Sequence, residues 1–286
     1  MQAFHIESNT KIDSVNLKVT DIDKSLEFYK SFLGFKIVKR ESSSVLLSPD
    51  GKLPYLVALT ETKTKPPNQK TAGLYHFAIL LPQRKDLANF FSYLMQHKNE
   101  VKIDGFSDHL VSEAIYIRDP DNIGIEIYRD REKSQWEWNN NLVHMTLDPL
   151  DIEGLQKEST RPWERFPAGT TIGHVHLHVS SLEKAEKFYS DFLGFKITSR
   201  MQGALFFAAG SYHHHIATNI WLGENIFPAN SDLPGLEYFT IKLSGDNNLY
   251  KLIDELNESE TQFTKLNDQL VTILDQDKIC IHLKEE

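Results

Sequence analysis

Three histidines in one short stretch have the types and spacing for metal or acid-base chemistry. Within residues 172–179, His174, His176 and His178 alternate with Val or Leu. A period of two is that of a β-strand, so the three imidazoles are expected on one face and the apolar side chains on the other. Imidazole binds metals and exchanges protons near neutral pH. The stretch therefore predicts a polar cavity or a metal site.

A second set of candidate residues lies some fifty to a hundred residues upstream of this stretch. Glu126 stands between Ile125 and Ile127, and His76 stands between two aromatic residues. If the strand around Glu126 is buried, its carboxylate must be paired or metal-bound, because burying a bare charge is costly. The alternative is a Glu that faces solvent on a half-exposed strand.

The elements that must position these residues come from an internal repeat. The block 15–37 recurs without a gap as 175–197, and Gly34 corresponds to Gly194 at an offset of 160 positions. Both copies contain Phe-Tyr followed by Phe-Leu-Gly-Phe-Lys-Ile. Self-similarity at a fixed offset predicts a fusion of two homologous halves.

Each copy predicts a strand followed by a helix, with Asp21 and Ser181 as N-caps and the two glycines at the helix ends. The pattern restarts inside each half, which predicts an α+β fold of four βαβββ modules. These are A (10–62), B (72–130), C (171–224) and D (234–284). We expect a first domain at 10–130, a linker at 131–170 and a second domain at 171–284.

Composition restricts the function classes. The chain has 286 residues, a formal net charge of −9 and one cysteine, Cys280. The acidic balance argues against a nucleic-acid or anionic-membrane binder, whose footprint is basic. The first residues carry no secretory signal, and no stretch approaches the roughly 20 apolar residues of a membrane span. We expect a cytoplasmic protein with a small-molecule partner; the oligomeric state stays open.

The chain resembles the vicinal-oxygen-chelate superfamily of glyoxalases, bleomycin-resistance proteins and extradiol dioxygenases. The resemblance rests on the repeated block, on Gly-x-x-His-Phe-Ala at 73–78 and on Asp-Pro-Asp-Asn-Ile-Gly-Ile-Glu at 119–126. It covers all four modules. More narrowly, residues 105–128 and 212–217 resemble two-domain bacterial catechol 2,3-dioxygenases and related ring-cleaving proteins. In this superfamily, two βαβββ modules cup a metal ion.

The resemblance implies a ligand set of two His and one Glu, which suits non-haem Fe(II) and could also hold Mn(II). His76 and Glu126 of module B and His174 of module C match ligand positions, whereas module A has Ser14 at the corresponding place. Neither half holds a complete set. We therefore expect an exchanged pairing, in which B and C build the metal site and A pairs with D.

A second arrangement would keep the site within modules C and D. There, Tyr238 and His282 stand where dioxygenases of this group have His and Glu, and His174 would be the third ligand. Tyrosine is a poorer ligand for Fe(II) than imidazole, so the B and C arrangement is preferred.

The resemblance also implies roles around the metal. His214 matches an acid-base histidine, and Tyr116 matches a tyrosine that donates to the substrate oxygen or to an oxygen intermediate. His109 and His176 are expected to contact substrate. No role follows for His178, His213, His215 or His282.

The function implied is extradiol ring cleavage of a catechol-type or hydroquinone-type aromatic diol by O₂, dependent on Fe(II). One alternative is a glyoxalase-like lyase or isomerase, which commonly has an additional Glu on the fourth strand of a module. The corresponding stretch of module C contains Ala217 and Asn219 instead. Another alternative is a non-catalytic binding or resistance protein, in which Ser14 and Tyr238 would mark a loss of chemistry.

Overall fold

The computed structural model describes residues 6–65, 69–245, 248–258 and 263–286. The chain divides into two compact units. Unit 1 comprises Met1–Lys18, Thr64–Tyr75 and His174–Glu286, and unit 2 comprises Val19–Lys63 and His76–Gly173. Within the described residues, no helix is both long enough and apolar enough to cross a bilayer.

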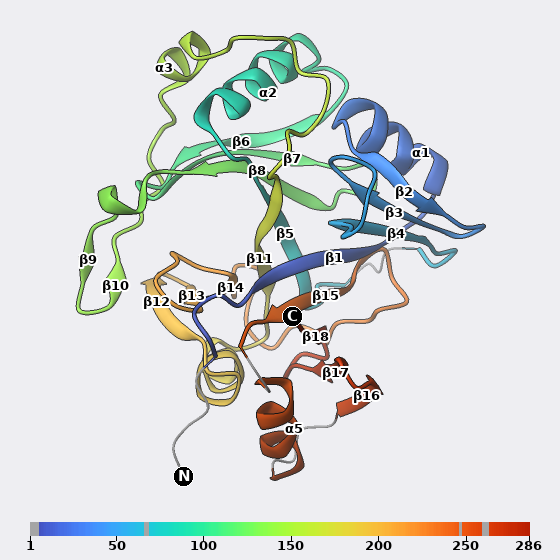
Figure 1. Ribbon diagram of the computed structural model, residues 1–286, viewed down its shortest axis with the longest axis vertical. Helices are drawn as coiled ribbons and strands as arrows, with labels where there is room; N and C mark the ends of the chain where they lie inside the picture. Colours follow the sequence, from blue (N-terminus) through green and yellow to red (C-terminus); the bar gives the residue numbers. More distant parts are fainter. Residues whose placement is uncertain (1–5, 66–68, 246–247, 259–262) are drawn as a thin grey trace. The chain divides into compact units, whose positions relative to one another are not determined.

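Unit 2 combines two sets of strands with short helices (Figure 1). Its helical segments are α1 (Ile22–Leu26), the π-helical η1 (Glu27–Phe32), α2 (Arg84–Gln96), the 3-10 turn η2 (Lys133–Gln135) and α3 (Ile152–Lys157). Its strands are β2 (Lys36–Arg40), β3 (Ser44–Ser48), β4 (Val57–Glu61), β6 (Lys102–Asp108), β7 (Ser112–Arg118), β8 (Gly124–Asp130), β9 (Trp138–Asn139) and β10 (Leu142–Val143). The helix α2 packs against β8.

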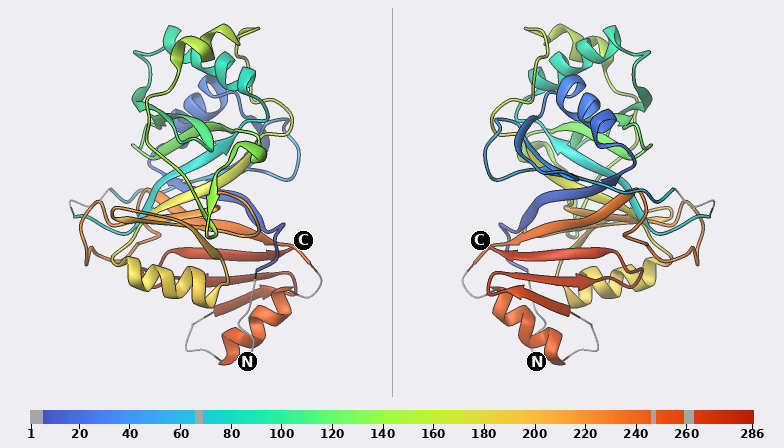
Figure 2. Two further views of the ribbon diagram at one scale, coloured as in Figure 1. Left: turned by 90° about the vertical axis from the view of Figure 1, so that its left-hand side faces the viewer. Right: turned by 90° about the vertical axis from the view of Figure 1, so that its right-hand side faces the viewer.

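Unit 1 repeats this composition. Its helical segments are α4 (Leu182–Glu186), the π-helical η3 (Lys187–Phe192) and α5 (Asn248–Glu258). Its strands are β12 (Lys196–Met201), β13 (Ala204–Ala208), β14 (Ile216–Asn219), β15 (Gly235–Leu243), β16 (Phe263–Asn267), β17 (Leu270–Leu274) and β18 (Cys280–Glu285). Figure 2 shows α5 beside the strands β16, β17 and β18.

Three strands, β1 (Lys11–Val19), β5 (Gly73–Leu80) and β11 (Thr171–His178), have residues in both units. Strand β1 pairs antiparallel with β15, and β5 is the neighbour of β11. Modules A and D therefore share one eight-stranded sheet, β16-β17-β18-β15-β1-β4-β3-β2, and modules B and C share the other, β12-β13-β14-β11-β5-β8-β7-β6. This strand order confirms the predicted α+β fold and its exchanged pairing of modules.

The repeated helices begin as the sequence predicts. The side chains of Asp21 and Ser181 accept hydrogen bonds from the backbone N–H three residues further on, which confirms both N-caps. Each helix then widens into a π-helical turn, so that the N–H of Leu33 donates to the carbonyl of Phe28 at 2.9 Å. The apolar spacing alone did not distinguish this π turn from a regular α-helix.

Glycine is required at the end of the first repeated helix for two reasons. Gly34 has a φ of +92°, a conformation that other residues adopt at a cost. A Cβ atom at this position would also lie 2.4 Å from the Cα atom of Arg165. The segment around Arg165 can therefore pack on this turn only because residue 34 has no side chain.

One buried hydrogen bond recurs in both halves. The hydroxyl of Tyr29, in module A, donates to Asp119 of module B at 3.0 Å, and Tyr189 of module C donates to Asp275 of module D at 2.8 Å. Each aspartate also accepts two backbone N–H groups of its own turn. Burial outweighs these hydrogen bonds and raises the pKa of Asp119 and of Asp275 to about 7.

These raised pKa values predict a pH-dependent stability. A carboxyl whose pKa is higher in the folded than in the unfolded state stabilises the fold below its unfolded pKa of about 4, and that contribution is lost as pH rises through about 7. The free energy of unfolding of the wild type should therefore fall between about pH 4 and 7, relative to the Asp119→Asn/Asp275→Asn variant, by up to about 1.4 kcal/mol per pH unit and group, and should level off above pH 7.

Denaturant titrations at several pH values measure this difference. Asp191→Asn, at an exposed carboxyl, serves as the control and should leave the pH dependence of the wild type unchanged. A constant difference between the wild type and the double variant over this range would contradict the raised pKa values of the two buried carboxyls.

Candidate metal centre

Three buried side chains form a group with the composition of a metal site. His76 on β5, Glu126 on β8 and His174 on β11 are 6%, 2% and 2% exposed. Each offers one ligand atom, and these atoms all lie within 4.8 Å of one another. The Nε2 atom of His76 lies 3.0 Å from Oε2 of Glu126. The structure thus brings together the three residues that the sequence analysis named as ligands.

The donor atoms of this group fit a divalent metal ion. Two imidazole nitrogens and one carboxylate oxygen form the set that suits non-haem Fe(II) and leaves coordination positions open. A carboxylate as buried as that of Glu126 needs a compensating charge or hydrogen bonds, because its desolvation is costly. A cation held by the three side chains would provide that compensation.

The strand pattern explains why Glu126 faces the group. Its neighbours Ile125 and Ile127 are fully buried on the opposite face of β8. In the register of the sheet, Glu126 lies opposite Tyr116 of β7 on one side and Ala78 of β5 on the other. Side chains directly opposite one another on neighbouring strands share a face, so Tyr116 and Ala78 flank Glu126.

Gly173 allows β11 to approach the neighbouring side chains closely. A Cβ atom at Gly173 would lie 1.7 Å from the hydroxyl oxygen of Tyr128, a fully buried residue of β8. Because Gly173 directly precedes His174, this close approach fixes the part of β11 that carries the third member of the group. The sequence analysis missed this role, although a glycine inside a strand is a known sign of close backbone approach.

The three consecutive histidines His213, His214 and His215 are all buried, and they lie in a loop that precedes β14. The ring of His214 lies 4.1 Å from that of His174, and the ring of His213 lies 6.2 Å from it. The Nδ1 atoms of His213 and His214 are 2.7 Å apart. His215 instead accepts the backbone N–H of Ala209. The structure therefore places His214 next to the ring of His174.

His176 and His178 are joined by a residue that the sequence analysis did not single out. The amide of Asn219 lies 2.9 Å from Nε2 of His176, and its oxygen lies 2.8 Å from Nδ1 of His178. The ring of Tyr75 lies 5.1 Å and 4.9 Å from the two imidazoles. Asn219 thus fixes the orientation of both side chains on β11.

Tyr116 and His109 form a second polar pair. Nε2 of His109 lies 2.7 Å from the hydroxyl of Tyr116, whose ring centroid is 5.5 Å from that of His76. On its other side, Nδ1 of His109 lies 2.7 Å from the backbone carbonyl of Thr146. Thr146 belongs to the segment predicted as a linker, and the sequence offered no sign of this contact.

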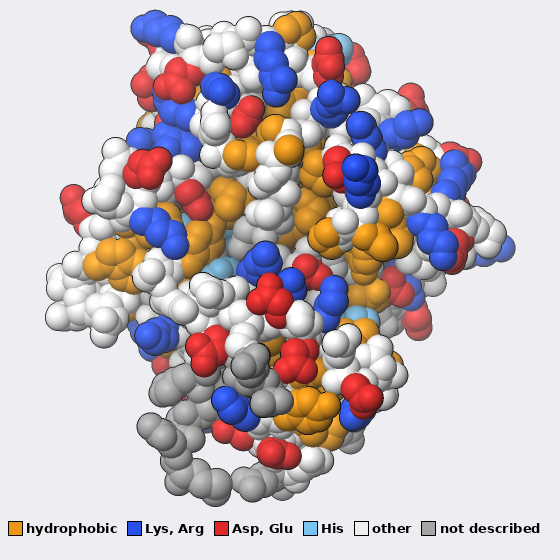
Figure 3. Space-filling model, in the orientation of Figure 1, with side chains coloured by type: hydrophobic (Ala, Val, Ile, Leu, Met, Phe, Trp, Pro, Cys, Tyr) orange, Lys and Arg blue, Asp and Glu red, His pale blue; other side chains and the backbone are white. Residues whose placement is uncertain are grey.

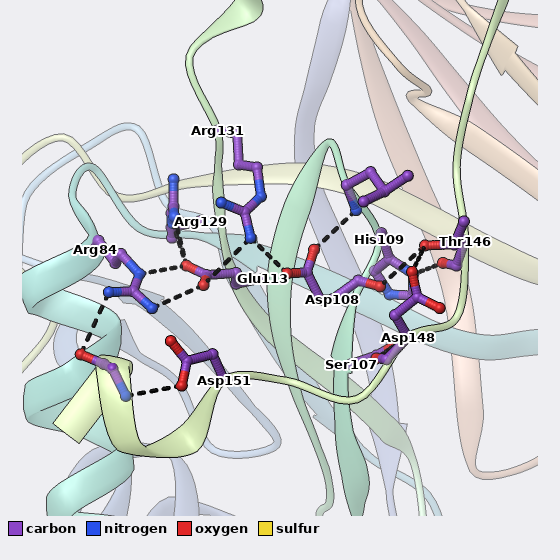
Figure 4. Close-up of polar contacts among 12 residues, drawn as sticks. Arg84, Ser107, Asp108, His109, Glu113, Arg129, Arg131, Thr146, Asp148 and Asp151 are labelled. Carbon is purple, nitrogen blue, oxygen red and sulfur yellow. Dashed lines mark hydrogen bonds and ion pairs between the residues drawn. The ribbon is translucent and has the colours of Figure 1, made fainter. Parts of the chain in front are cut away.

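A buried ion network supports the strands that carry these residues (Figure 4). Glu113 of β7 is 1% exposed and contacts Arg84 at 2.7 Å and Arg129 at 2.5 Å. Burial alone would raise the pKa of Glu113, but the two guanidinium groups hold it below its usual value. At the surface, in contrast to this buried network, acidic and basic side chains are interspersed on the face of the molecule that Figure 3 draws.

Tyr238 and His282, the ligands of the second predicted arrangement, lie in the sheet of modules A and D. Their rings stack with centroids 3.7 Å apart, and burial lowers the pKa of His282. Ser14, in the same sheet, donates to the hydroxyl of Thr240. Within the described part of the chain, the group of possible metal ligands contains none of these residues.

The sequence is similar to proteins of known classes. Residues 11–127 and 171–222 match the family described as the Glyoxalase/Bleomycin resistance protein/Dioxygenase superfamily. The chain is also 42% identical over 245 residues to a catechol-2,3-dioxygenase of Bacillus subtilis (strain 168). That alignment covers 83% of this chain and 84% of the relative.

Solved structures share the fold at low sequence identity. A putative dioxygenase from Bacillus subtilis superposes with a TM-score of 0.67 at 11% identity, covering 99% of this chain and 86% of the other. A glyoxalase I mutant from Zea mays superposes with a TM-score of 0.56 at 15% identity, covering 97% and 92%. At these identities the likeness extends to the fold alone.

The close approach at Gly173 predicts a coupling between two residues. Gly173→Ala should lower the free energy of unfolding by about 1–3 kcal/mol, because the added methyl group meets the Tyr128 hydroxyl in a packed interior. Tyr128→Phe removes that hydroxyl, so the double variant should lose less stability than the sum of the two single variants. Denaturant unfolding of all four proteins measures the coupling, and strictly additive losses would contradict this explanation.

Proposed function

Because the chain belongs to the glyoxalase/bleomycin resistance protein/dioxygenase superfamily, we propose that it is an extradiol ring-cleaving dioxygenase acting on a catechol-type diol with O₂. The observation that carries this proposal is the buried group of His76, Glu126 and His174. The 42% identity to a catechol-2,3-dioxygenase supports the same reaction class. We further propose Fe(II) as the metal ion that these three side chains hold.

Within this proposal, a bound Fe(II) would supply open coordination positions at which the diol and O₂ are held together. Side chains of the protein would then transfer protons and form hydrogen bonds with the substrate. His214, whose ring lies beside that of His174, would take a proton from the diol and return it when the ring opens. Tyr116, the neighbour of Glu126 in the sheet, would hydrogen-bond a substrate oxygen.

The remaining polar residues shape the pocket in this proposal. His176, held by Asn219, and His109, held by the Thr146 carbonyl, would contact substrate. The residues of β14 favour ring cleavage over a glyoxalase-type reaction. Where a fourth ligand would be expected, Asn219 is instead engaged with His176 and His178.

The ligand assignment is tested by removing one donor. His174→Ala should reduce the metal affinity by at least about 10- to 100-fold, the loss that even outer-shell substitutions cause, and should abolish ring cleavage. His282→Ala provides a matched control, because this half-buried histidine lies in the sheet of modules A and D. Its metal content should equal that of the wild type.

The measurements are metal analysis after anaerobic purification, followed by addition of catechol and O₂. Bound iron, O₂ uptake and a yellow ring-cleavage product are expected for the wild type and for His282→Ala. Unchanged iron in His174→Ala would overturn the site assignment. Bound nickel or zinc with turnover of a thiol adduct would favour a glyoxalase-like enzyme, and tight binding of an aromatic ligand without metal would favour a binding protein.

A further inference from the structure

The segment Thr146–Asp148 is fastened to the edge of β6. Asp148 and Asp108 exchange two backbone hydrogen bonds of 2.8 and 2.9 Å. The hydroxyl of Thr146 donates to the carboxylate of Asp148 at 2.7 Å, and the N–H of Thr146 donates to the carbonyl of His109. These bonds place the Thr146 carbonyl against the His109 ring, as Figure 4 shows.

Ion pairs hold the edge strand β6 in place. Arg131 contacts the carboxylate of Asp108 at 2.5 Å and that of Glu113 at 3.5 Å. Because Glu113 is buried and paired with further arginines, this contact connects the turn that carries His109 to the interior of unit 2. The position of His109 is therefore fixed by the segment Thr146–Asp148 on one side and by the ion pairs of Arg131 on the other.

The contact with Thr146 determines which ring nitrogen of His109 carries the proton. A backbone carbonyl only accepts hydrogen bonds, so the 2.7 Å contact requires a proton on Nδ1. In the neutral imidazole, Nε2 is then an acceptor. The 2.7 Å contact between Nε2 and the Tyr116 hydroxyl must therefore have Tyr116 as its donor.

We propose that Thr146 is a positioning residue of the ring-cleavage site. Its carbonyl fixes His109 in the Nδ1–H tautomer, and Nε2 of His109 in turn accepts the hydrogen bond that the Tyr116 hydroxyl donates. The Tyr116 oxygen, beside Glu126, then presents only lone pairs to a ligand. It accepts a hydrogen bond from a substrate hydroxyl, where the family resemblance implied a donor. This inference rests on the proposed function and selects for ligands with a free hydroxyl over their methyl ethers.

The tautomer is measured without reference to activity. In the metal-free full-length protein labelled with ¹⁵N-histidine, nitrogen shifts distinguish the two neutral tautomers, and comparison with His109→Gln assigns the signals of His109. We expect protonated Nδ1 and unprotonated Nε2. The opposite tautomer would overturn the inference while leaving the proposed function untouched. Absence of ring cleavage in the wild type would instead overturn the proposed function and leave the tautomer result standing.

Two pairs of variants test the positioning role. Thr146→Val and Asp148→Ala both remove the hydrogen bond that anchors the carbonyl, so the tautomers should mix and kcat should fall about 5- to 10-fold with iron content unchanged. Asp148→Asn keeps an oxygen that accepts from Thr146 and should retain wild-type kcat and tautomer. Leu147→Ala, at a side chain 72% exposed in the same segment, should also behave as the wild type.

A ligand comparison tests the hydrogen-bond direction. In the metal-free protein, catechol should bind at least about tenfold more tightly than 1,2-dimethoxybenzene, because neither oxygen of the diether can donate to Tyr116. Tyr116→Phe should reduce that preference. Unchanged kcat and tautomer in both Thr146→Val and Asp148→Ala, or an unchanged preference in Tyr116→Phe, would contradict the inference.

Discussion

The site depends on the burial of one carboxylate. Glu126 lies among apolar strands with almost no exposure, so its charge must be balanced by groups that other strands bring to it. His76 lies at hydrogen-bonding distance, and His174 completes the set. This requirement explains why the order of the strands matters, since β8 supplies the carboxylate and β5 and β11 supply the imidazoles.

The exchanged pairing of modules completes a set of candidate ligands that neither half contains by itself. Module B has two of the proposed ligands and lacks a third, whereas module C has a histidine on its first strand. Placing β5 beside β11 in one sheet joins them. The same exchange places β1 beside β15, where Ser14, Tyr238 and His282 occupy the corresponding positions and form hydrogen-bonded or stacked pairs among themselves and their neighbours.

The two halves share a structural hydrogen bond but differ in their candidate metal ligands. The buried hydrogen bonds of Tyr29 with Asp119 and of Tyr189 with Asp275 are equivalent, and both join the two modules of one half. The proposed ligand positions, by contrast, are filled in only one of the two sheets. An equivalent hydrogen bond between modules is therefore present in both halves.

The sequence by itself determined the repeat and both helix caps, and it predicted the module boundaries and the three candidate ligands. The repeat and the caps follow from residue types at matching positions, whereas the ligand set was implied by the resemblance to the superfamily. The sequence predicted the exchanged pairing of modules but left a site within modules C and D as an alternative. The tertiary structure decided between the two, because strand pairing joins residues far apart in the chain. It also revealed the contributions of Gly173, Asn219 and Thr146. The absent side chain of Gly173, the amide of Asn219 and the backbone carbonyl of Thr146 produce no periodic pattern in the sequence. Their roles depend on contacts that form only when the strands β8, β11, β14 and β6 pair with their neighbours.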